Sequence, residues 1–310
     1  MNMNKLKKDS SGIATILLLI IIVVVVAGAG VAAYVVLSNN GGSNEEAPKE
    51  MPIAQGLAPG TVLKYDIYNG TKTTQAEFHY VGQNTTSYFV KNVVVISPLI
   101  SEEEYELVSK GAPAGAKYIG KEDRTTFEGK LNLQIWEYSE TINGKKYTFK
   151  EYVNPANGLT YYREMRADGV MPVTFTLKYY DLKTQISYTP SSSLGKAYEY
   201  TGYVSGVKHT AKLTVIADCT GGKYGIEMSG NVTHLYLSNY PQGVPINAVK
   251  DMEGTLPGTI DGDVYVDKLL YGLTNGEMEF YCHATTHIVY GFIVDLDDGP
   301  YIIFDLTKKP

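Results

Sequence analysis

Apolar residues follow two different patterns along this chain. Residues 13–37, IATILLLIIIVVVVAGAGVAAYVVL, form an unbroken apolar run without charge or proline. A bilayer core roughly 30 Å thick needs about 20 apolar residues in a helix, so this run predicts a transmembrane helix. From residue 60 onward, short segments such as AEFHYVG and KLNLQIWEY instead alternate apolar and polar positions, which is typical of antiparallel β-strands. The sequence therefore predicts a single-pass membrane protein whose larger part is mainly β.

Charges on either side of the apolar run predict its orientation. Lys5, Lys7 and Lys8 precede it, and the first charges that follow it are Glu45 and Glu46. Positive charge favours the cytoplasmic side, so we expect a cytoplasmic amino terminus and an extracytoplasmic carboxy-terminal part.

Composition divides the flanks of the run into two short segments. Residues 1–12 form a basic cytoplasmic tip, and residues 38–57 are polar and interrupted by Gly and Pro, which predicts a flexible tether.

Three interpretations of the leader compete. Its 25 apolar residues exceed the 7 to 15 that are typical of a cleavable signal, which favours an uncleaved signal anchor. Ala27-Gly28-Ala29 fits a secretory cleavage site, but the chain stays apolar beyond it. The third interpretation rests on residues 12–15, GIAT, which follow KKD at 7–9 and resemble the class III signal of archaeal type IV pilins and archaellins. That resemblance implies an archaeal protein, cleavage after Gly12, and a helix that packs into a filament core.

Turn signals separate the expected strands. Asn69-Gly70, Asn143-Gly144 and Asn157-Gly158 each lie between strand candidates, where such pairs favour tight hairpins. Residues 101–111, SEEEYELVSKG, interrupt this pattern with a capping-box spacing and a terminal glycine, so they predict a short helix. The expected fold is a β-meander with one or two short helices.

An internal repeat divides the β-rich part into two units. Residues 60–78 align with residues 195–213, so that Gly60 matches Gly195 and Tyr65 matches Tyr200. The alignment continues from Asn143-Gly144 to Asn275-Gly276 and from residues 180–182 to residues 304–306. Periods of 20 to 50 residues indicate solenoids, so a repeat this long indicates duplicated domains, at residues 58–188 and 194–310.

The strand and turn order of residues 130–165 resembles the half-barrel sheets of lipoprotein-carrier-type envelope proteins. In that family a curved sheet encloses an apolar cavity for lipid. The resemblance therefore implies a curved sheet or half-barrel here, and it makes a lipid carrier one hypothesis.

The two cysteines and three sequons lie in the part expected outside the cytoplasm. An even cysteine count in an oxidising compartment favours a disulfide between Cys219 and Cys282, with two unpaired core thiols as the alternative. Asn69, Asn84 and Asn231 each begin an Asn-x-Thr sequon, which predicts glycosylation of a surface protein.

Candidate chemistry is sparse. Cys282 and His283 are neighbours in an expected strand and so point to opposite faces, which argues against a metal site with His287. The aspartates do not match a calcium loop and are expected to be solvated turn residues; they are Asp261, Asp263, Asp267, Asp295, Asp297 and Asp298. Glu137, Glu140 and Glu151 are expected on the solvated face of a sheet. The sequence contains no catalytic motif such as Gly-x-Ser-x-Gly or His-Glu-x-x-His, so we expect neither an enzyme nor a cofactor.

These observations favour an envelope protein with a binding, adhesion or structural role. Its expected partners are the bilayer, through residues 13–37, and a surface protein or glycan. A net charge of −6, with no Lys/Arg run longer than two residues in the part expected outside the cytoplasm, argues against nucleic acid. A type IV pilin-like filament subunit and a carrier of lipid or another small hydrophobic ligand are the alternatives.

Overall fold

The structure is a computed structural model, which describes residues 47–54, 56–97, 100–142, 144–185, 187–204, 206–230, 233–273, 276–297 and 301–310. The expected membrane helix, the basic tip with Gly12, and Asn231 lie outside these residues. No helix in the part that is described has the length and apolar character needed to cross a membrane.

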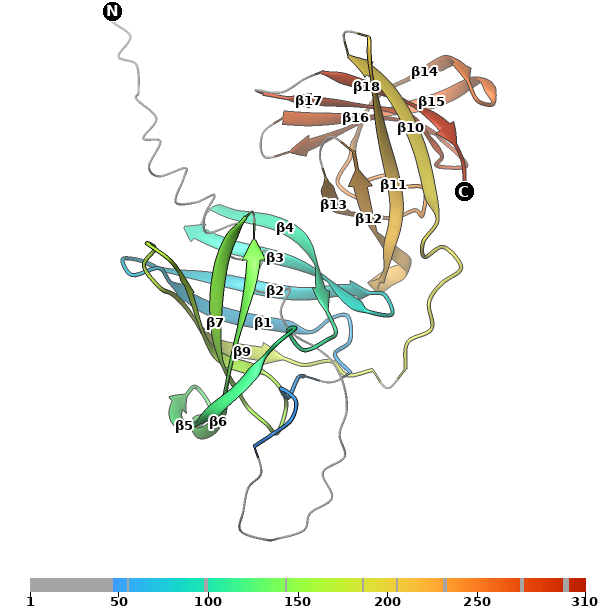
Figure 1. Ribbon diagram of the computed structural model, residues 1–310. Coiled ribbons are helices and arrows are strands. Elements are labelled where there is room, and N and C mark those ends of the chain that lie inside the picture. The colour runs from blue at the N-terminus through green and yellow to red at the C-terminus, as the bar shows by residue number, and fades with distance from the viewer. Residues whose placement is uncertain are drawn as a thin grey trace, which may run out of the picture. The chain divides into compact units, whose positions relative to one another are not determined.

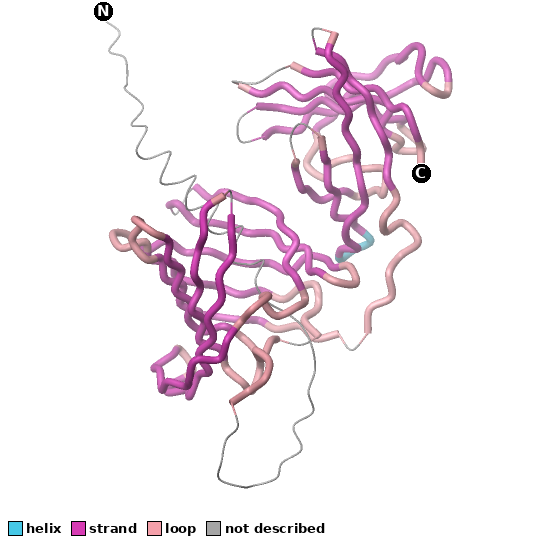
Figure 2. Tube along the Cα trace, viewed as in Figure 1, coloured by secondary structure: helices cyan, strands magenta, loops and turns pink. Residues whose placement is uncertain are grey.

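The chain forms two compact units, each built from antiparallel strands (Figure 1). The first unit contains the described residues as far as Tyr80 and residues 86–185, and the second contains residues 81–85 and 187–310. Strand dominates both units in Figure 2, and the 3-10 turn Thr220–Gly222 is the only helix among the described residues. The expectation of a mainly β, antiparallel protein is therefore confirmed.

Nine strands make up the described part of the first unit. They are β1 (Val62–Tyr68), β2 (Thr73–Gln83), β3 (Ser87–Ser97), β4 (Ile100–Ser109), β5 (Lys117–Thr126), β6 (Gly129–Ile142), β7 (Lys145–Val153), β8 (Thr160–Ala167) and β9 (Val173–Asp181). Antiparallel pairing runs in the order β2-β1-β9-β8-β7-β6-β5, and β3 pairs with β4.

The second unit also has nine strands in its described residues. They are β10 (Ala197–Val204), β11 (Val207–Cys219), β12 (Lys223–Ser229), β13 (His234–Ser238), β14 (Val249–Thr259), β15 (Gly262–Leu273), β16 (Gly276–His283), β17 (Val289–Leu296) and β18 (Ile302–Lys308). Pairing runs β13-β12-β11-β10-β18-β17-β16 and on through β15 to β14. The order from β11 to β14 matches that from β2 to β5.

The start of each unit repeats the same backbone geometry. Gly60 and Gly195 have positive φ angles of 100° and 80°. The Gly60 amide donates to the Tyr80 carbonyl at 2.7 Å, and the Gly195 amide donates to the Val215 carbonyl at 2.9 Å. Both glycines and both acceptors are 135 residues apart, as the sequence alignment predicts.

A matched tyrosine then joins distant strands in each unit. Tyr65 donates its hydroxyl to the Thr160 carbonyl at 2.9 Å, and Tyr200 donates to the Val289 carbonyl at 3.0 Å. Thr160 and Val289 are the first residues of β8 and β17. Each tyrosine also follows a bulge in the pairing of its strand with the last strand of the unit. The aromatic repeat in the sequence thus corresponds to a repeated hydrogen bond.

The sequence alignment is wrong at the ends of the units. Tyr65 pairs with Leu177, and Tyr200 pairs with Leu306, so the offset there is 129 residues rather than 124. Part of this change in offset arises in the β6–β7 hairpin. The segment between the paired residues Ile135 and Tyr152 is four residues longer than its counterpart in β15–β16, between the paired residues Lys268 and Tyr281. The similar triplets at residues 180–182 and 304–306 misled the alignment, because sequence similarity alone does not show where the second unit has lost residues.

The predicted helix at residues 101–111 is wrong. These residues lie largely in β4, where Glu106 pairs with Val90 and Val108 pairs with Tyr88. Glu106 and Val108 are buried while Ser109 is exposed, a period of two that belongs to a strand. Pairing with β3 therefore overrides the local capping signals, because helix propensity is a weak preference beside tertiary contacts.

The predicted tether is also wrong in its second half. Met51, Ile53, Ala54 and Leu57 are at most 6% exposed and pack into the first unit. Leu57 forms an isolated bridge with Thr184. Composition alone missed this because a few apolar residues among Gly and Pro are enough to fill a core position.

Gly158 lies directly against the segment of residues 51–57. Its φ is +69°, and an added Cβ would lie 1.8 Å from the Ile53 carbonyl carbon. Gly158→Ala is expected to lower the free energy of unfolding by about 2–5 kcal/mol, through backbone strain and overpacking. Chemical denaturation measures the change.

Gly169→Ala is the matched control. Gly169 has φ of +71° but no heavy atom within 4 Å of its would-be Cβ, so only the strain of about 1–2 kcal/mol applies. Equal losses in the two variants would contradict the packing of residues 51–57 on the first unit.

Candidate functional site

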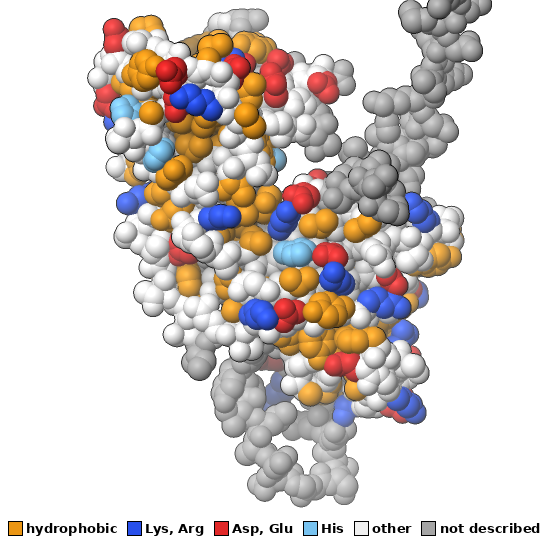
Figure 3. All heavy atoms as spheres, turned by 180° about the vertical axis from the view of Figure 1, so that it is seen from behind, with side chains coloured by type: hydrophobic (Ala, Val, Ile, Leu, Met, Phe, Trp, Pro, Cys, Tyr) orange, Lys and Arg blue, Asp and Glu red, His pale blue; other side chains and the backbone are white. Residues whose placement is uncertain are grey.

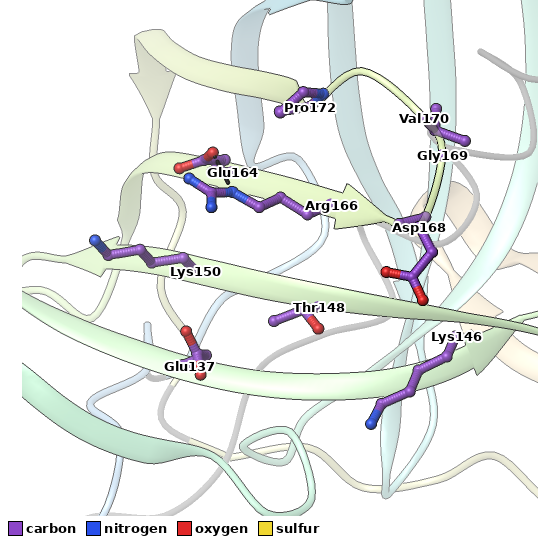
Figure 4. Close-up of a pocket in the computed structure, with 11 residues that line it drawn as sticks. Glu137, Lys146, Thr148, Lys150, Glu164, Arg166, Asp168, Gly169, Val170 and Pro172 are labelled. Carbon is purple, nitrogen blue, oxygen red and sulfur yellow. Dashed lines mark hydrogen bonds and ion pairs between the residues drawn. The ribbon is translucent and has the colours of Figure 1, made fainter.

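A groove of about 630 Å³ lies on the solvated face of β6, β7 and β8 (Figure 4). Side chains from three neighbouring strands and from the β8–β9 turn line it. They are Glu137, Lys146, Thr148, Lys150, Glu164, Arg166, Ala167, Asp168, Gly169, Val170 and Pro172.

Strand register arranges charges of alternating sign along the floor of the groove. Glu137 pairs with Lys150, and Lys150 pairs with Glu164, which gives a Glu-Lys-Glu row across three strands. In the next row Thr148 pairs with Arg166, whose Nε donates to Glu164 Oε1 at 2.5 Å. The groove therefore offers ion-pairing and hydrogen-bonding groups of both signs to a polar ligand.

Aromatic and cationic side chains extend the same face beyond the groove. The Arg124 guanidinium, from β5, lies 3.9 Å from the Tyr152 ring centroid and 4.1 Å from that of Tyr162. Lys150 lies 5.3 Å from the Tyr152 ring. These cation–π contacts hold Arg124 over the sheet and so fix part of the surface next to the groove.

A buried charge pair lies on the opposite face of the same strands. Glu151 is 0% exposed and Arg163 is 5% exposed, and Arg163 Nη2 lies 2.7 Å from Glu151 Oε1. Tyr138 donates to Glu151 Oε1 at 2.6 Å, and Thr160 donates to Glu151 Oε2 at 2.5 Å. Charge pairing and hydrogen bonds offset the cost of removing this carboxylate from water.

The second unit replaces this pair with two aromatic rings. Counted from the equivalent bulges in β7–β8 and β16–β17, Glu151 corresponds to Phe280 and Arg163 corresponds to Phe292. Phe280 and Phe292 pair across the strands and stack with ring centroids 5.9 Å apart. The two units thus share a backbone arrangement but have different core chemistry.

A second buried carboxylate belongs to the first unit. Glu106 is 3% exposed and accepts a hydrogen bond at 2.7 Å from Nδ2 of Asn92, which is 1% exposed. Glu106 Oε2 has no hydrogen-bond partner within the described residues. Burial raises the pKa of Glu106 well above its usual value. This carboxyl group is therefore a titratable group in the core.

The predicted disulfide is absent, and both Cys219 and Cys282 are free thiols. Cys219 ends β11 and Cys282 lies in β16, with β10, β18 and β17 between them in the strand order. Four strand spacings are about 19 Å along the sheet, whereas a disulfide needs Cα atoms within about 7 Å. Burial raises the pKa of Cys219 to about 12 and that of Cys282 to about 11. Spacing in the sequence could not reveal this separation.

The three glutamates expected on the solvated face do not share one. Glu137 is exposed and lines the groove, but Glu151 is completely buried on the other face. The reason is register: Glu151 pairs with Trp136, and Glu140 has the same parity as Trp136. Burial raises the pKa of Glu140.

The sequons occupy different environments. Asn69 lies in the β1–β2 turn, where its Oδ1 accepts hydrogen bonds from Thr71 and Lys72. Asn84 donates its Nδ2, the atom that glycosylation would modify, to the Ile216 carbonyl at 2.8 Å. Glycosylation stays a prediction at these sites.

Cys282 and His283, which are neighbours in the sequence, lie in different environments. Cys282 is buried in the core, whereas His283 accepts hydrogen bonds at Nδ1 from the amides of Thr285 and Thr286. Within the described ranges, no group of three or more His, Cys, Asp or Glu residues is placed to hold a metal ion. Asp261 is more than a solvated turn residue, because it contacts Tyr290 and Lys309.

Sequence reasoning missed Arg163 and Glu106 as residues of interest. Their signal was present: Arg163 and Glu106 stand at strand positions whose neighbours two residues away, Tyr161, Met165 and Val108, are apolar and buried. A charge at such a position marks either a buried partner or a change of face.

No protein-family model matches the chain, and no curated protein matches it. Among solved structures, MucB shares 9% sequence identity with a TM-score of 0.29, covering 83% of this chain and 90% of MucB. The Pseudomonas aeruginosa MucA/MucB complex gives 8% identity and a TM-score of 0.28, covering 81% and 88%. Kievitone hydratase from Nectria haematococca gives 9% and 0.18, covering 85% and 94%. Similarity this low carries no functional argument, so function is argued from the residues of the chain.

The contrast between the two cores can be tested by exchange. Glu151→Ala or Arg163→Ala alone should cost about 3–5 kcal/mol of unfolding free energy, because each leaves a buried charge unpaired. The double variant Glu151→Phe with Arg163→Phe copies Phe280 and Phe292 and should cost less than either single change. Chemical denaturation of all three gives the comparison.

Arg166→Ala is the control for this series, since the Arg166 side chain is 65% exposed and an ion pair of this kind is worth about 0–1 kcal/mol. A double variant as unstable as the sum of the two single changes would show that the charge pair itself is required.

The raised pKa of Glu106 predicts a pH dependence. Below the ordinary carboxyl pKa, Glu106 is protonated in both the folded and unfolded states. The protonated side chain then makes its full contribution to the free energy of unfolding. As the pH rises toward the raised pKa, ionisation of the unfolded state removes that contribution. Glu106→Gln should therefore increase stability at pH about 7 and have little effect at pH about 3. Melting temperatures across this range, with exposed Glu137→Gln as the control, measure it; a pH-independent difference would contradict burial of the carboxyl group.

Proposed function

We propose that this chain is a non-enzymatic binding protein of the cell envelope, held at the membrane by residues 13–37. The groove on β6, β7 and β8 binds a segment of a partner protein. Its Glu-Lys-Glu row is the observation that supports this proposal. A partner segment that carries basic and acidic side chains in turn would complement this row, and such complementarity favours specificity over tight binding.

The lining of the groove agrees with a polar partner. Figure 3 shows Lys, Arg, Asp and Glu side chains scattered among hydrophobic ones on one face of the molecule. Polar rims are typical of non-obligate protein interfaces. The groove itself is lined mainly by polar side chains, which favours a charged peptide segment over a hydrophobic ligand.

The inner faces support the groove over the carrier hypothesis. A lipid or small hydrophobic ligand would need open apolar space inside a sheet. In the first unit Phe149 and Phe175 are 0% exposed, and in the second Phe280 and Phe292 are 0% exposed. These side chains belong to two clusters of buried hydrophobic residues, one in each unit.

We further propose that the two units are copies of one ancestral curved sheet, of the half-barrel kind. Supporting observations are the shared strand order, the paired glycines Gly60 and Gly195, and the paired tyrosines Tyr65 and Tyr200. Figure 1 shows the curvature within each unit. Only the groove-bearing unit would then bind the partner.

Binding of a synthetic peptide tests the groove. A fluorescent 12-residue peptide of alternating Lys and Glu should bind the full chain more tightly than Lys-only or Glu-only peptides, as measured by anisotropy. Lys150→Glu should weaken this binding at least about tenfold, equivalent to roughly 1.4 kcal/mol, because it breaks the Glu-Lys-Glu row. Lys72→Glu makes the same charge change in the exposed β1–β2 turn and should leave binding unchanged.

Equal weakening by Lys72→Glu, or tighter binding of a neutral oligosaccharide than of the mixed peptide, would overturn the proposed partner. Sequencing the mature amino terminus tests the anchor separately. An intact terminus in the membrane fraction supports it, whereas a terminus at Ile13 in sheared fibres would favour the filament subunit.

A further inference from the structure

Two hairpin turns, one in each unit, have the same internal hydrogen bonds. The turn Thr126–Gly129 joins β5 to β6, and the turn Thr259–Gly262 joins β14 to β15. In each, the threonine Oγ1 donates to the glycine carbonyl, at 2.9 Å and 2.6 Å. The amide of the third residue, Glu128 or Asp261, donates back to that Oγ1 at 3.2 Å. The sequences TFEG and TIDG therefore form one recurring turn.

The acidic residue at the third position of each turn contacts strands far along the sheet. Glu128 accepts hydrogen bonds from the hydroxyls of Tyr161 and Tyr180, the latter at 2.5 Å. Asp261 accepts hydrogen bonds from Tyr290 and from the Lys309 ammonium group. Each carboxylate thus accepts one hydrogen bond from Tyr161 or Tyr290 and a second one from Tyr180 or Lys309.

The donors occupy equivalent positions in the two units. Tyr161 and Tyr290 are the extra residues of the bulges in β7–β8 and β16–β17 pairing. A bulge re-aims the side chain of its extra residue, which explains how a strand residue reaches the turn. Tyr180 lies near the end of β9, and Lys309 directly follows β18. These two residues are 129 positions apart, the same offset as between Tyr161 and Tyr290.

These contacts span several strands. In the strand order, β8 and β9 are separated from β5 by β7 and β6, and the second unit repeats this arrangement with β17, β18 and β14. The hairpin made of the last strand in this order and its neighbour therefore reaches back to the middle strands of the same order. We name these hairpins the arms: β5–β6 is the first arm and β14–β15 the second arm.

We infer that each carboxylate is a latch that holds its arm closed against the sheet, and that the second latch alone is sensitive to salt. The first latch uses two neutral hydroxyl donors. It is reinforced by Phe127, whose ring stacks on Tyr161 at 5.9 Å and meets Tyr180 edge-on at 5.7 Å. The second latch uses an ammonium group, and the residue at the position of Phe127 is Ile260, which has no aromatic ring to stack on a tyrosine.

The difference follows from the physics of the two donor sets. Salt screens the attraction between solvent-exposed charges, with a Debye length of about 10 Å at 0.1 M and about 3 Å at 1 M. The Lys309 hydrogen bond, followed by that from Tyr290, lowers the pKa of Asp261 below its usual value, as expected for an ionised acceptor. Opening the second arm would expose Val264 and Val266 of β15, which are buried in the hydrophobic cluster of the second unit. Opening the first would expose Leu133 of β6, which is buried in the cluster of the first unit.

Hydrogen–deuterium exchange of the full chain tests this inference. Raising KCl from about 0.05 M to about 1 M should speed exchange of second-arm amides by about threefold to tenfold and leave the first arm unchanged. Lys309→Met should give the fast rate at both salt concentrations. Glu128→Gln should speed only the first arm, also at both concentrations.

Lys308→Met is the matched control, because Lys308 pairs with Glu199 at 2.9 Å outside the latch. It should leave the exchange of the second arm and its salt response as they are in the parent chain. Binding of a hydrophobic fluorescent dye gives a second readout, and it should increase in Lys309→Met but not in Lys308→Met. Lys309→Arg keeps the charge and should restore the closed arm.

Equal salt responses in the two arms, or an effect of Lys308→Met as large as that of Lys309→Met, would overturn the salt-sensitive latch. Unchanged exchange in Glu128→Gln would overturn the first latch. Neither result depends on peptide binding at the groove, so this inference and the proposed function can fail separately.

Discussion

Antiparallel pairing decides on which face of the sheet each side chain lies, and a single bulge reverses the side chains that follow it. Glu137 and Glu151 show the consequence: their register places one in the solvated groove and the other in the core. Tyr161 and Tyr290 are bulge residues, and each uses that irregularity to reach the turn of an arm. The groove, the buried charge pair and both latches all depend on this constraint.

The two units keep their backbone contacts while their cores differ. Tyr65 and Tyr200 make the same long-range hydrogen bond to the first residue of a strand. Between those fixed points, an ion pair in one unit is replaced by stacked aromatic rings in the other. Such an exchange is physically reasonable, because a buried ion pair contributes little net stability compared with packed apolar side chains of similar volume. A charged core and an apolar core can therefore use the same strand order.

The groove and the arms assign different roles to different parts of the sheet. The groove uses exposed side chains on the solvated face, where alternating charge can recognise a polar partner without a conformational change. In each arm, one carboxylate instead connects the turn of the hairpin with a strand in the middle of the strand order or with the residue that follows it. Because Lys309 is charged and Tyr180 is not, similar geometry gives latches that respond differently to ionic strength.

The sequence by itself determined the strand character, the division into two units near residue 190, and the matches of Gly60 with Gly195 and Tyr65 with Tyr200. Alternation of apolar residues and the recurrence of glycine and tyrosine at a fixed spacing are properties of the sequence itself, so they can be read along the chain. The strand at residues 101–109, the packing of Met51 and Ile53, the separation of Cys219 from Cys282 and the Glu151–Arg163 pair required the tertiary structure. Each depends on which strands are neighbours and in what register, and those pairings join residues far apart in the chain.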